Sequence, residues 1–279
     1  PLCSSESIME CKIPNDIYRC RCCDLLYLKD IDYDKTKIQN IDLNAWFDTI
    51  MPLRTRTFNA ILDVFDRLNI GKYGLEVGSS RGLFLSMCKE RQINCIGIEP
   101  EKETYEYSRS KNLDVHHGFF PNDLPKDKHS FDFIIFNDVF EHIPDIQQVL
   151  DISYSLLNQN SYLVLNLPLS TGFFYSLSKI GKFFGSNILL RRLWQLDFYT
   201  PHIYYHNQET INKICEIYNF TIMHTQRLEV VSKTDFEQRF IMDSSLSKFR
   251  FIALPIINLL LPILGYFKPD ISVFYLQKN

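Results

Sequence analysis

A glycine-rich turn between a strand-like and a helix-like segment is the part of the sequence best suited to bind a ligand. It spans residues 75–82 and reads LEVGSSRG. Gly78 and Gly82 let the backbone bend sharply and approach a ligand closely. The helix that follows offers unpaired N–H groups and a positive dipole end. The segment therefore predicts a site for a nucleoside-like or anionic group.

Two acidic residues narrow the choice of ligand. Glu76, at the tip of the first strand, would repel a pyrophosphate but attract an ammonium or a sulfonium group. A second apolar strand ends at Glu99, and 99 − 78 = 21 residues separate it from Gly78. That offset is close to the roughly 20 residues at which an acid reaches a ribose hydroxyl in nucleotide-binding folds. We therefore expect S-adenosylmethionine rather than a dinucleotide. The alternative is an ordinary βα turn that binds nothing.

The elements that must position these residues alternate regularly between strands and helices. An amphipathic helix is expected over 46–69. Further strands are expected over 93–98, 114–117, 131–136 and 161–166, and closing strands over 220–223 and 271–275. Further helices are expected after Gly82, from Pro100 to about Lys111, near Pro144, and from Asn207 to Tyr218. This rhythm predicts an α/β fold with a parallel sheet and right-handed crossovers.

The composition is that of an ordinary globular chain. Its 279 residues are 46% hydrophobic and 23% charged, enough for one large core with an appendage or for two modest domains. The net charge of −3 gives no general attraction to nucleic acid. No charged-then-apolar start with a cleavage site precedes the core, so we expect a cytoplasmic location.

The cysteines are concentrated at one end of the chain. Five of the eight fall within the first 23 residues, and without a secretory signature this clustering favours a metal over disulfides. We interpret residues 1–30 as a zinc-ribbon-like head that is incomplete, because a second C-x-x-C pair would need a cysteine before Pro1. The predicted ligands are Cys3, Cys20 and Cys23, with Cys22 or Cys11 as substitutes. The alternative is a reduced, metal-free loop.

Two aromatic or apolar segments interrupt the alternation. Residues 171–198 mix aromatic with basic side chains, which is consistent with a substrate lid, a membrane-facing surface or a helical insertion packed on the core. Residues 251–267 are uncharged and contain Pro255 and Pro262. This run is shorter than the roughly 20 residues that span a bilayer, so we expect a buried or interfacial element.

The segment after the fourth strand carries a more specific pattern. Residues 137–145 read NDVFEHIPD. Together with the glycine turn and Glu99, this run resembles the class I S-adenosylmethionine-dependent methyltransferases, in the branch with an E-H-[IV]-P-D signature. The cysteine-rich head looks like that of branch members found with surface-polysaccharide genes. The resemblance covers about residues 71–230. It implies a Rossmann-like seven-stranded sheet, mostly parallel with one antiparallel strand, within a domain over 45–279 that has a helical lid insertion at about 171–200.

The resemblance also implies roles for individual residues. The predicted cofactor-binding residues are Glu76, Gly78, Ser79, Gly82, Glu99, Pro100, Phe119, Asn137 and Asp138. In this family the acid after the second strand binds both ribose hydroxyls, and the residue at Phe119 lies beside adenine. The family often has an acid close behind the preceding glycine, whereas this chain reads Gly118-Phe119-Phe120.

An oxygen acceptor would also need a base. His142 is the first candidate for the catalytic base and His202 the second, because an imidazole accepts a proton near neutral pH. The alternative is that Glu141 and His142 only shape the pocket wall. A metal site formed by His202 and His206 is not expected, because both precede the helix that starts at Asn207.

The expected function is methyl transfer to a small-molecule or sugar acceptor in polysaccharide or secondary-metabolite biosynthesis, with an O-methyl product favoured. One alternative is an RNA methyltransferase whose zinc head binds RNA. The negative net charge argues against this alternative. Another is a binding module without turnover. The expected partner is a small molecule or glycan, with peripheral membrane contact through 171–198 or 251–267 as a further expectation. The sequence does not define the oligomeric state.

Overall fold

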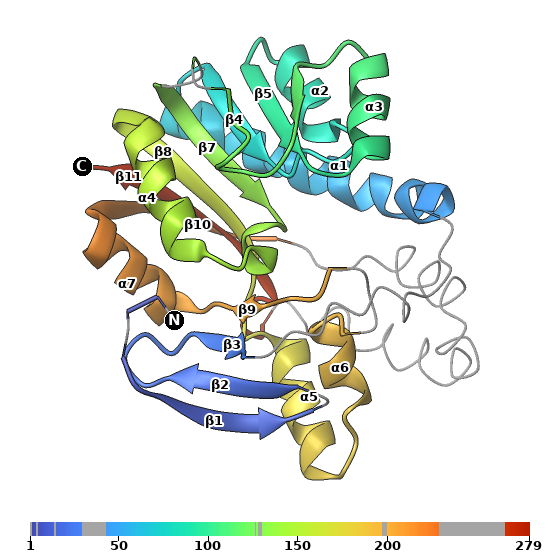
Figure 1. Cartoon of the computed structure of the whole chain (residues 1–279), viewed down its shortest axis with the longest axis vertical. Helices are drawn as coiled ribbons and strands as arrows, with labels where there is room; N and C mark the ends of the chain where they lie inside the picture. Colours follow the sequence, from blue (N-terminus) through green and yellow to red (C-terminus); the bar gives the residue numbers. More distant parts are fainter. Residues whose placement is uncertain are drawn as a thin grey trace.

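The structure is a computed structural model in which two β-sheets follow one another along the long axis of the molecule (Figure 1). It describes residues 2–3, 5–13, 15–29, 43–125, 127, 130–196, 200–228 and 266–279. The predicted apolar element over 251–267 lies outside the described residues except for Tyr266 and Phe267, which are both exposed.

The larger sheet has seven strands in the order β10-β11-β8-β7-β4-β5-β6. They are β4 (Tyr73–Val77), β5 (Asn94–Glu99), β6 (Val115–His117), β7 (Phe131–Asn137), β8 (Leu157–Pro168), β10 (Phe220–Arg227) and β11 (Ile271–Lys278). Strand β11 runs antiparallel to both of its neighbours, whereas the β6-β5-β4-β7-β8 pairs are all parallel. The predicted Rossmann-like sheet, mostly parallel with one antiparallel strand, is confirmed.

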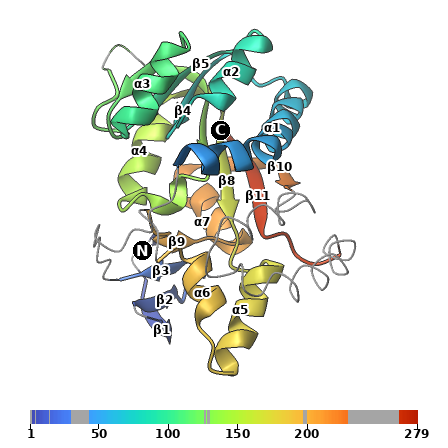
Figure 2. The ribbon, with the colours of Figure 1, turned by 90° about the vertical axis from the view of Figure 1, so that its right-hand side faces the viewer.

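Helices cover both faces of this sheet. They are α1 (Leu43–Leu68), α2 (Leu83–Glu90), α3 (Lys102–Ser110), α4 (Ile146–Leu156) and α7 (Gln208–Tyr218). Figure 2 shows α1 and α4 on opposite sides of the strands. In β7, Phe133 and Ile135 pack with residues of α1 and α2, whereas Ile134 and Phe136 pack with residues of α4 and α7. Because β7 is buried on both faces, its sequence is a nearly continuous run of apolar residues.

Polar side chains set where the helices begin. The Asp145 carboxylate accepts the Gln148 N–H at 3.0 Å, so α4 begins just after Pro144. The Asn207 side chain accepts the Thr210 N–H at 3.0 Å and caps α7 as predicted. The predicted start of α3 at Pro100 is wrong by two residues. Its cause is Glu99, whose carboxylate accepts the Glu101 N–H at 2.9 Å and holds this stretch in a turn.

The smaller sheet joins the start of the chain to a much later segment. It contains β1 (Ser7–Lys12), β2 (Asp16–Cys20), β3 (Leu26–Leu28) and β9 (Tyr204–Tyr205), in that order. Helices α5 (Phe173–Phe183) and α6 (Ile188–Leu193) lie beside it, at the opposite end of the molecule from β5 (Figures 1 and 2). One hydrophobic cluster of this region contains the buried residues Ile13, Ile17, Leu26, Leu28, Tyr175, Leu190, Trp194 and Tyr205. The cysteine-rich head and the helical insertion therefore share one hydrophobic cluster.

The outer surface of the insertion carries several exposed apolar side chains. The exposed large hydrophobic residues on α5, α6 and the turn between them are Leu177, Ile180, Phe183, Phe184 and Ile188, and Phe183 is 85% exposed. Within the described ranges, the structure contains no helix that is both long and apolar enough to cross a membrane.

Candidate active site

The turn after β4 has the backbone shape that its glycines predict. Gly78 and Gly82 both adopt positive φ, at 70° and 74°, where residues with a side chain are strained. The Gly78 N–H donates to the Ile98 carbonyl at 2.9 Å, which draws the turn against the end of β5. A Cβ at Gly78 would lie 2.6 Å from the side chain of Val139. The turn therefore passes close to the loop after β7, and only glycine fits there.

Glu76 and Asn137 meet at the carboxyl ends of β4 and β7. The Asn137 amide donates to Glu76 Oε1 at 2.9 Å. Glu76 is only 2% exposed, and its Oε2 finds no hydrogen-bond partner among the described residues. Burial raises the pKa of Glu76 to about 8, although the Asn137 amide and the charge of Arg54 act in the opposite direction. A buried carboxylate oxygen left without a partner suits a cationic ligand group.

Glu99 joins the turns that follow β4 and β5. Its carboxylate accepts the Ser80 N–H at 2.7 Å and the Glu101 N–H at 2.9 Å. Burial raises the pKa of Glu99, and these two backbone donors oppose the shift. The carboxyl group therefore lies at the carboxyl edge of the sheet, where ligands bind in open α/β sheets.

The predicted adenine side of the site lies after β6. Phe119 is 67% exposed, so its ring is free to stack on a planar group. Its N–H donates to Asp123 Oδ2 at 2.8 Å, which places an acid here that we did not predict from the sequence. The Pro100 carbonyl oxygen lies 3.1 Å from Nε2 of His117.

A second group of side chains lies after β7. Glu141 and His142 belong to the 3-10 helix η2 (Phe140–His142), and His202 comes from the segment 200–206. Two hydrogen bonds tie the segments together, from Ile203 N–H to the Glu141 carbonyl at 2.8 Å and from Nδ1 of His142 to the Pro201 carbonyl at 2.9 Å. The rings of His142 and His202 are 4.8 Å apart between centroids. The two predicted catalytic histidines are therefore neighbours in space. We call Glu141, His142 and His202 the acceptor-side cluster.

Burial dominates the electrostatics of this cluster. It raises the pKa of Glu141 well above the ordinary range, and the nearby charge of Asp138 acts in the same direction. It lowers the pKa of His142, which the Pro201 carbonyl opposes, and lowers that of His202 further. Both imidazoles are therefore neutral near pH 7 and can accept a proton or donate a lone pair.

The sequence of the chain matches a known family over most of this region. Residues 52–225 match the profile of a methyltransferase domain family, which is more than half of the chain. The chain belongs to this methyltransferase family. Its predicted class, an S-adenosylmethionine-dependent methyltransferase, is confirmed. Among curated protein sequences, none is significantly similar.

Solved structures support the same fold. A SAM dependent methyltransferase from Archaeoglobus fulgidus has a TM-score of 0.53 at 20% identity, covering 84% of this chain and 99% of that one. The magnesium protoporphyrin IX methyltransferase from Synechocystis PCC 6803, solved with bound SAH, has a TM-score of 0.52 at 15% identity, covering 83% and 86%. At these identities the likeness extends to the fold, and the methyl acceptor of this chain is a separate question.

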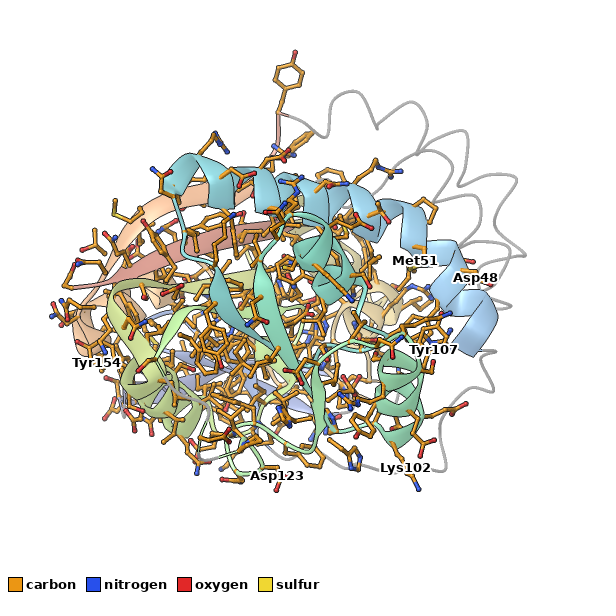
Figure 3. All side chains as sticks on the ribbon, turned by 90° about the horizontal axis from the view of Figure 1, so that it is seen from above. Asp48, Met51, Lys102, Tyr107, Asp123 and Tyr154 are labelled. Atoms are coloured by element: carbon orange, nitrogen blue, oxygen red, sulfur yellow. The ribbon has the colours of Figure 1, made fainter. Side chains whose placement is uncertain are left out.

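Two arginines that lie near these site residues were not predicted from the sequence. Arg54 of α1 forms an ion pair with Asp138, with Nη1 and Oδ2 3.0 Å apart. The Arg81 guanidinium lies 4.1 Å above the ring of Phe47 and 5.0 Å above that of Tyr107. The start of α1 thus lies beside α3, as the labelled Asp48, Met51 and Tyr107 show in Figure 3. A signal for Arg54 existed, because it lies four residues before Phe58 on the apolar stripe of its helix.

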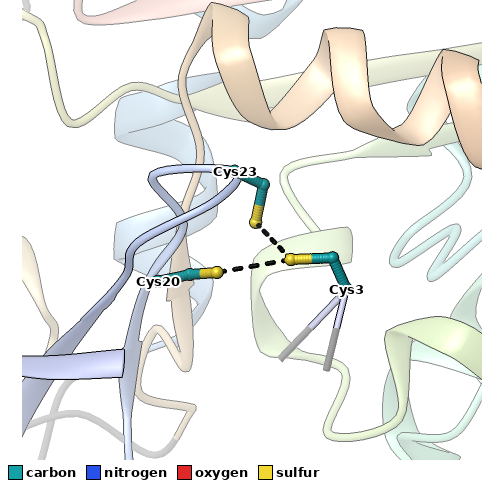
Figure 4. Close-up of side chains that lie close together, drawn as sticks. All are labelled: Cys3, Cys20 and Cys23. Atoms are coloured by element: carbon teal, nitrogen blue, oxygen red, sulfur yellow. Dashed lines mark hydrogen bonds between the residues drawn. The ribbon is translucent and has the colours of Figure 1, made fainter. Parts of the chain in front are cut away.

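The structure also brings together the three cysteines predicted as metal ligands (Figure 4). Sγ of Cys3 lies 3.3 Å from Sγ of Cys20 and 3.6 Å from that of Cys23. The substitutes Cys11 and Cys22 do not belong to this group within the described part of the chain. Cys11 packs instead at the hydrophobic cluster of the insertion, and Cys22 is exposed.

Proposed function

We propose that this methyltransferase transfers a methyl group from S-adenosylmethionine to an oxygen of a small-molecule or sugar acceptor. The observation that carries the proposal is the buried carboxylate oxygen of Glu76 that has no hydrogen-bond partner in the part of the chain that the structure describes. It lies at the end of the sheet where the glycine turn, Glu99 and the acceptor-side cluster also gather.

The residues at this edge fit the methyl donor group by group. Glu76 would bind the cationic methionine moiety, with Asn137 and Asp138 beside it. The backbone at Gly78, Ser79 and Gly82 would approach the donor closely. Glu99 would receive the ribose hydroxyls. Phe119 and Pro100 would lie next to the adenine. When bound, the donor supplies a methyl group activated by its sulfonium.

Glu141 and His142 of the acceptor-side cluster lie only three and four residues beyond Asp138. An acceptor hydroxyl held there would form its new C–O bond as the methyl C–S bond breaks, with the electron pair going to sulfur. The hydroxyl proton must leave in the same event. The neutral imidazole of His142 would accept this proton at Nε2, because its Nδ1 donates to the Pro201 carbonyl, with His202 against it as the second candidate base. Alignment of the acceptor with the methyl group supplies much of the remaining rate.

Titration calorimetry with S-adenosylmethionine, followed by uptake of labelled methyl, tests this proposal. We expect saturable binding heat and label on nucleotide sugars or phenols. Absence of heat at millimolar ligand would rule out the donor. Labelling of RNA that falls steeply with salt would instead favour the RNA methyltransferase alternative.

The ionisation of Glu76 predicts how binding depends on pH. Because its pKa is about 8 in the free chain, Glu76 is protonated near neutral pH, whereas a bound cationic group favours the carboxylate. Binding therefore releases a proton, and affinity for S-adenosylmethionine rises as the pH approaches 8, by at most about tenfold per unit, and then levels off. Arg54 and Glu99 are the charged neighbours that tune this value.

Calorimetry in buffers of different ionisation enthalpy measures the released proton directly. We expect Glu76→Gln to bind more weakly and to release no proton. A wild-type affinity that is flat between neutral pH and pH 9 would contradict the role given to Glu76.

We also propose a structural zinc ion at Cys3, Cys20 and Cys23. Sulfur atoms around a tetrahedral zinc lie about 3.8 Å apart, given Zn–S distances of about 2.3 Å, and the observed separations of 3.3 and 3.6 Å are close to this. Thr210 Oγ1 also donates to the Cys23 carbonyl at 2.9 Å, so the group is anchored to α7. The ion would therefore fix the start of the chain to the turn after β2, which Thr210 in turn anchors to α7.

Replacement of Cys23 by serine tests the zinc proposal. We expect Cys23→Ser to lose most of its zinc in elemental analysis and to unfold about 4–8 °C earlier, for a loss of ~2 kcal/mol. Cys22→Ser is the matched control, because Cys22 is exposed and outside the group. Zinc far below one per chain in the unmodified protein would exclude the site.

A further inference from the structure

The acceptor-side cluster has the composition and spacing of a metal site. One ligand atom from each of Glu141, His142 and His202 lies within 4.8 Å of the other two. Nε2 of His202 is 3.9 Å from Oε1 of Glu141, which is too far for a direct hydrogen bond. The three groups thus face a common point without satisfying one another.

Burial makes this arrangement costly for the Glu141 carboxylate unless a cation lies against it. Glu141 is 1% exposed and His202 is 7% exposed. Oε2 of Glu141 and Nδ1 of His202 have no hydrogen-bond partner among the described residues. A buried polar group without a partner costs about 1–3 kcal/mol, and more when it is charged. A cation at the common point would remove this cost for the carboxylate.

The orientation of His142 is that of a metal ligand. Its Nδ1 lies 2.9 Å from the Pro201 carbonyl, and since a carbonyl only accepts, this nitrogen carries the proton. Nε2 is then the nitrogen with the lone pair. Histidines that bind metals commonly donate their other N–H to a backbone carbonyl in this way. The backbone bond from Ile203 to Glu141 fixes the two segments that supply the ligands.

We propose that Glu141, His142 and His202 bind a divalent cation of the class that accepts mixed imidazole and carboxylate ligands, such as Mn²⁺, Fe²⁺, Co²⁺ or Zn²⁺. Three protein ligands leave coordination positions open. Asp138, held by Arg54, adds a further negative charge close by.

An open position would bind the oxygen of the methyl acceptor, a step that rests on the function proposed above. A hydroxyl bound to a divalent cation loses its proton more readily. That proton would go to solvent, the oxygen would form the bond to the methyl carbon, and the C–S bond would break toward sulfur. His142 and His202 would then act as ligands that hold the ion, and acceptors with two neighbouring oxygens would bind best because they can chelate.

Titration of the whole chain with Mn²⁺, followed by electron paramagnetic resonance, tests the site. Manganese prefers oxygen and nitrogen ligands to thiolates, so the cysteine group does not interfere. We expect about one bound Mn²⁺ per chelator-treated chain. Glu141→Gln and His142→Gln, which preserve side-chain size, should weaken binding by at least about 100-fold, the upper end of the effect of losing an outer hydrogen-bond partner. His224→Gln, in β10, is the matched control.

The outcomes separate this inference from the proposed function. No loss of the free Mn²⁺ signal at millimolar concentration, or wild-type binding by both variants, overturns the cation site. Full methyl transfer by the chelator-treated protein would also overturn it, while leaving the proposed function in place. Mn²⁺ binding that depends on these residues, without methyl transfer to any acceptor, would support the site and contradict the proposed function. Unchanged circular dichroism of both variants excludes misfolding as the cause.

Discussion

Glu99→Ala is expected to weaken S-adenosylmethionine binding by at least about 100-fold. A hydrogen bond to a charged group contributes about 1.5–3 kcal/mol, and loss of both bonds from the ribose hydroxyls therefore corresponds to a factor of about 10² to 10⁴. Titration calorimetry measures the change, and a thermal-shift assay with and without ligand provides a second readout.

The Glu99 carboxylate also stabilises the backbone, and the experiment must separate this structural role from ligand binding. It accepts the backbone N–H groups of Ser80 and Glu101, so alanine also loosens the two turns. Glu99→Gln keeps an acceptor oxygen and the side-chain length, and should fall between wild type and alanine. Glu101→Ala is the matched control, since its side chain is exposed and only its backbone takes part. Unchanged affinity in Glu99→Ala would mean that the ribose binds elsewhere.

The parts of the fold that could be predicted from the sequence are those determined by local signals. The strands that carry Glu76, Glu99 and Asn137 at or next to their last residue are short apolar runs. These polar residues lie at one edge because parallel strands share a carboxyl edge. Asn207 marks a helix start by the same local chemistry. The start of α3 was misplaced because the Glu99 carboxylate competes for the backbone of the first expected turn.

These local signals do not predict contacts between segments that are far apart in the sequence. The pairing of β3 with β9 joins residues 26–27 to 204–205, and no periodicity within either segment specifies its partner. The same holds for His142 and His202, which are 202 − 142 = 60 residues apart. The sequence predicts each histidine as a candidate base but does not predict that their rings meet. The sequence predicts Glu141 only as part of the pocket wall. Its burial against two neutral imidazoles is visible only once the fold brings the segment 200–206 back to η2.

His142→Gln is expected to lower kcat by about 10² to 10⁴, the usual contribution of a group that assists proton loss in the transition state. Affinity for S-adenosylmethionine should stay unchanged, because His142 is not one of the predicted donor-binding residues and its ring bonds to the Pro201 carbonyl. Single-turnover transfer of labelled methyl measures the first quantity and calorimetry the second. Loss of both together would instead indicate that His142 only supports the pocket wall.

A double-mutant comparison tests whether the two histidines act as one unit. Their rings are in contact, and residues of one network give strongly non-additive effects. We therefore expect His142→Gln, His202→Gln and the double variant to lose nearly the same factor in kcat, because removing either histidine already disables the group that acts on the acceptor. Losses that multiply would mean that each histidine works alone. That result would contradict both a shared role in proton loss and a shared cation, whereas a common loss that chelator treatment of the wild-type chain reproduces would favour the cation.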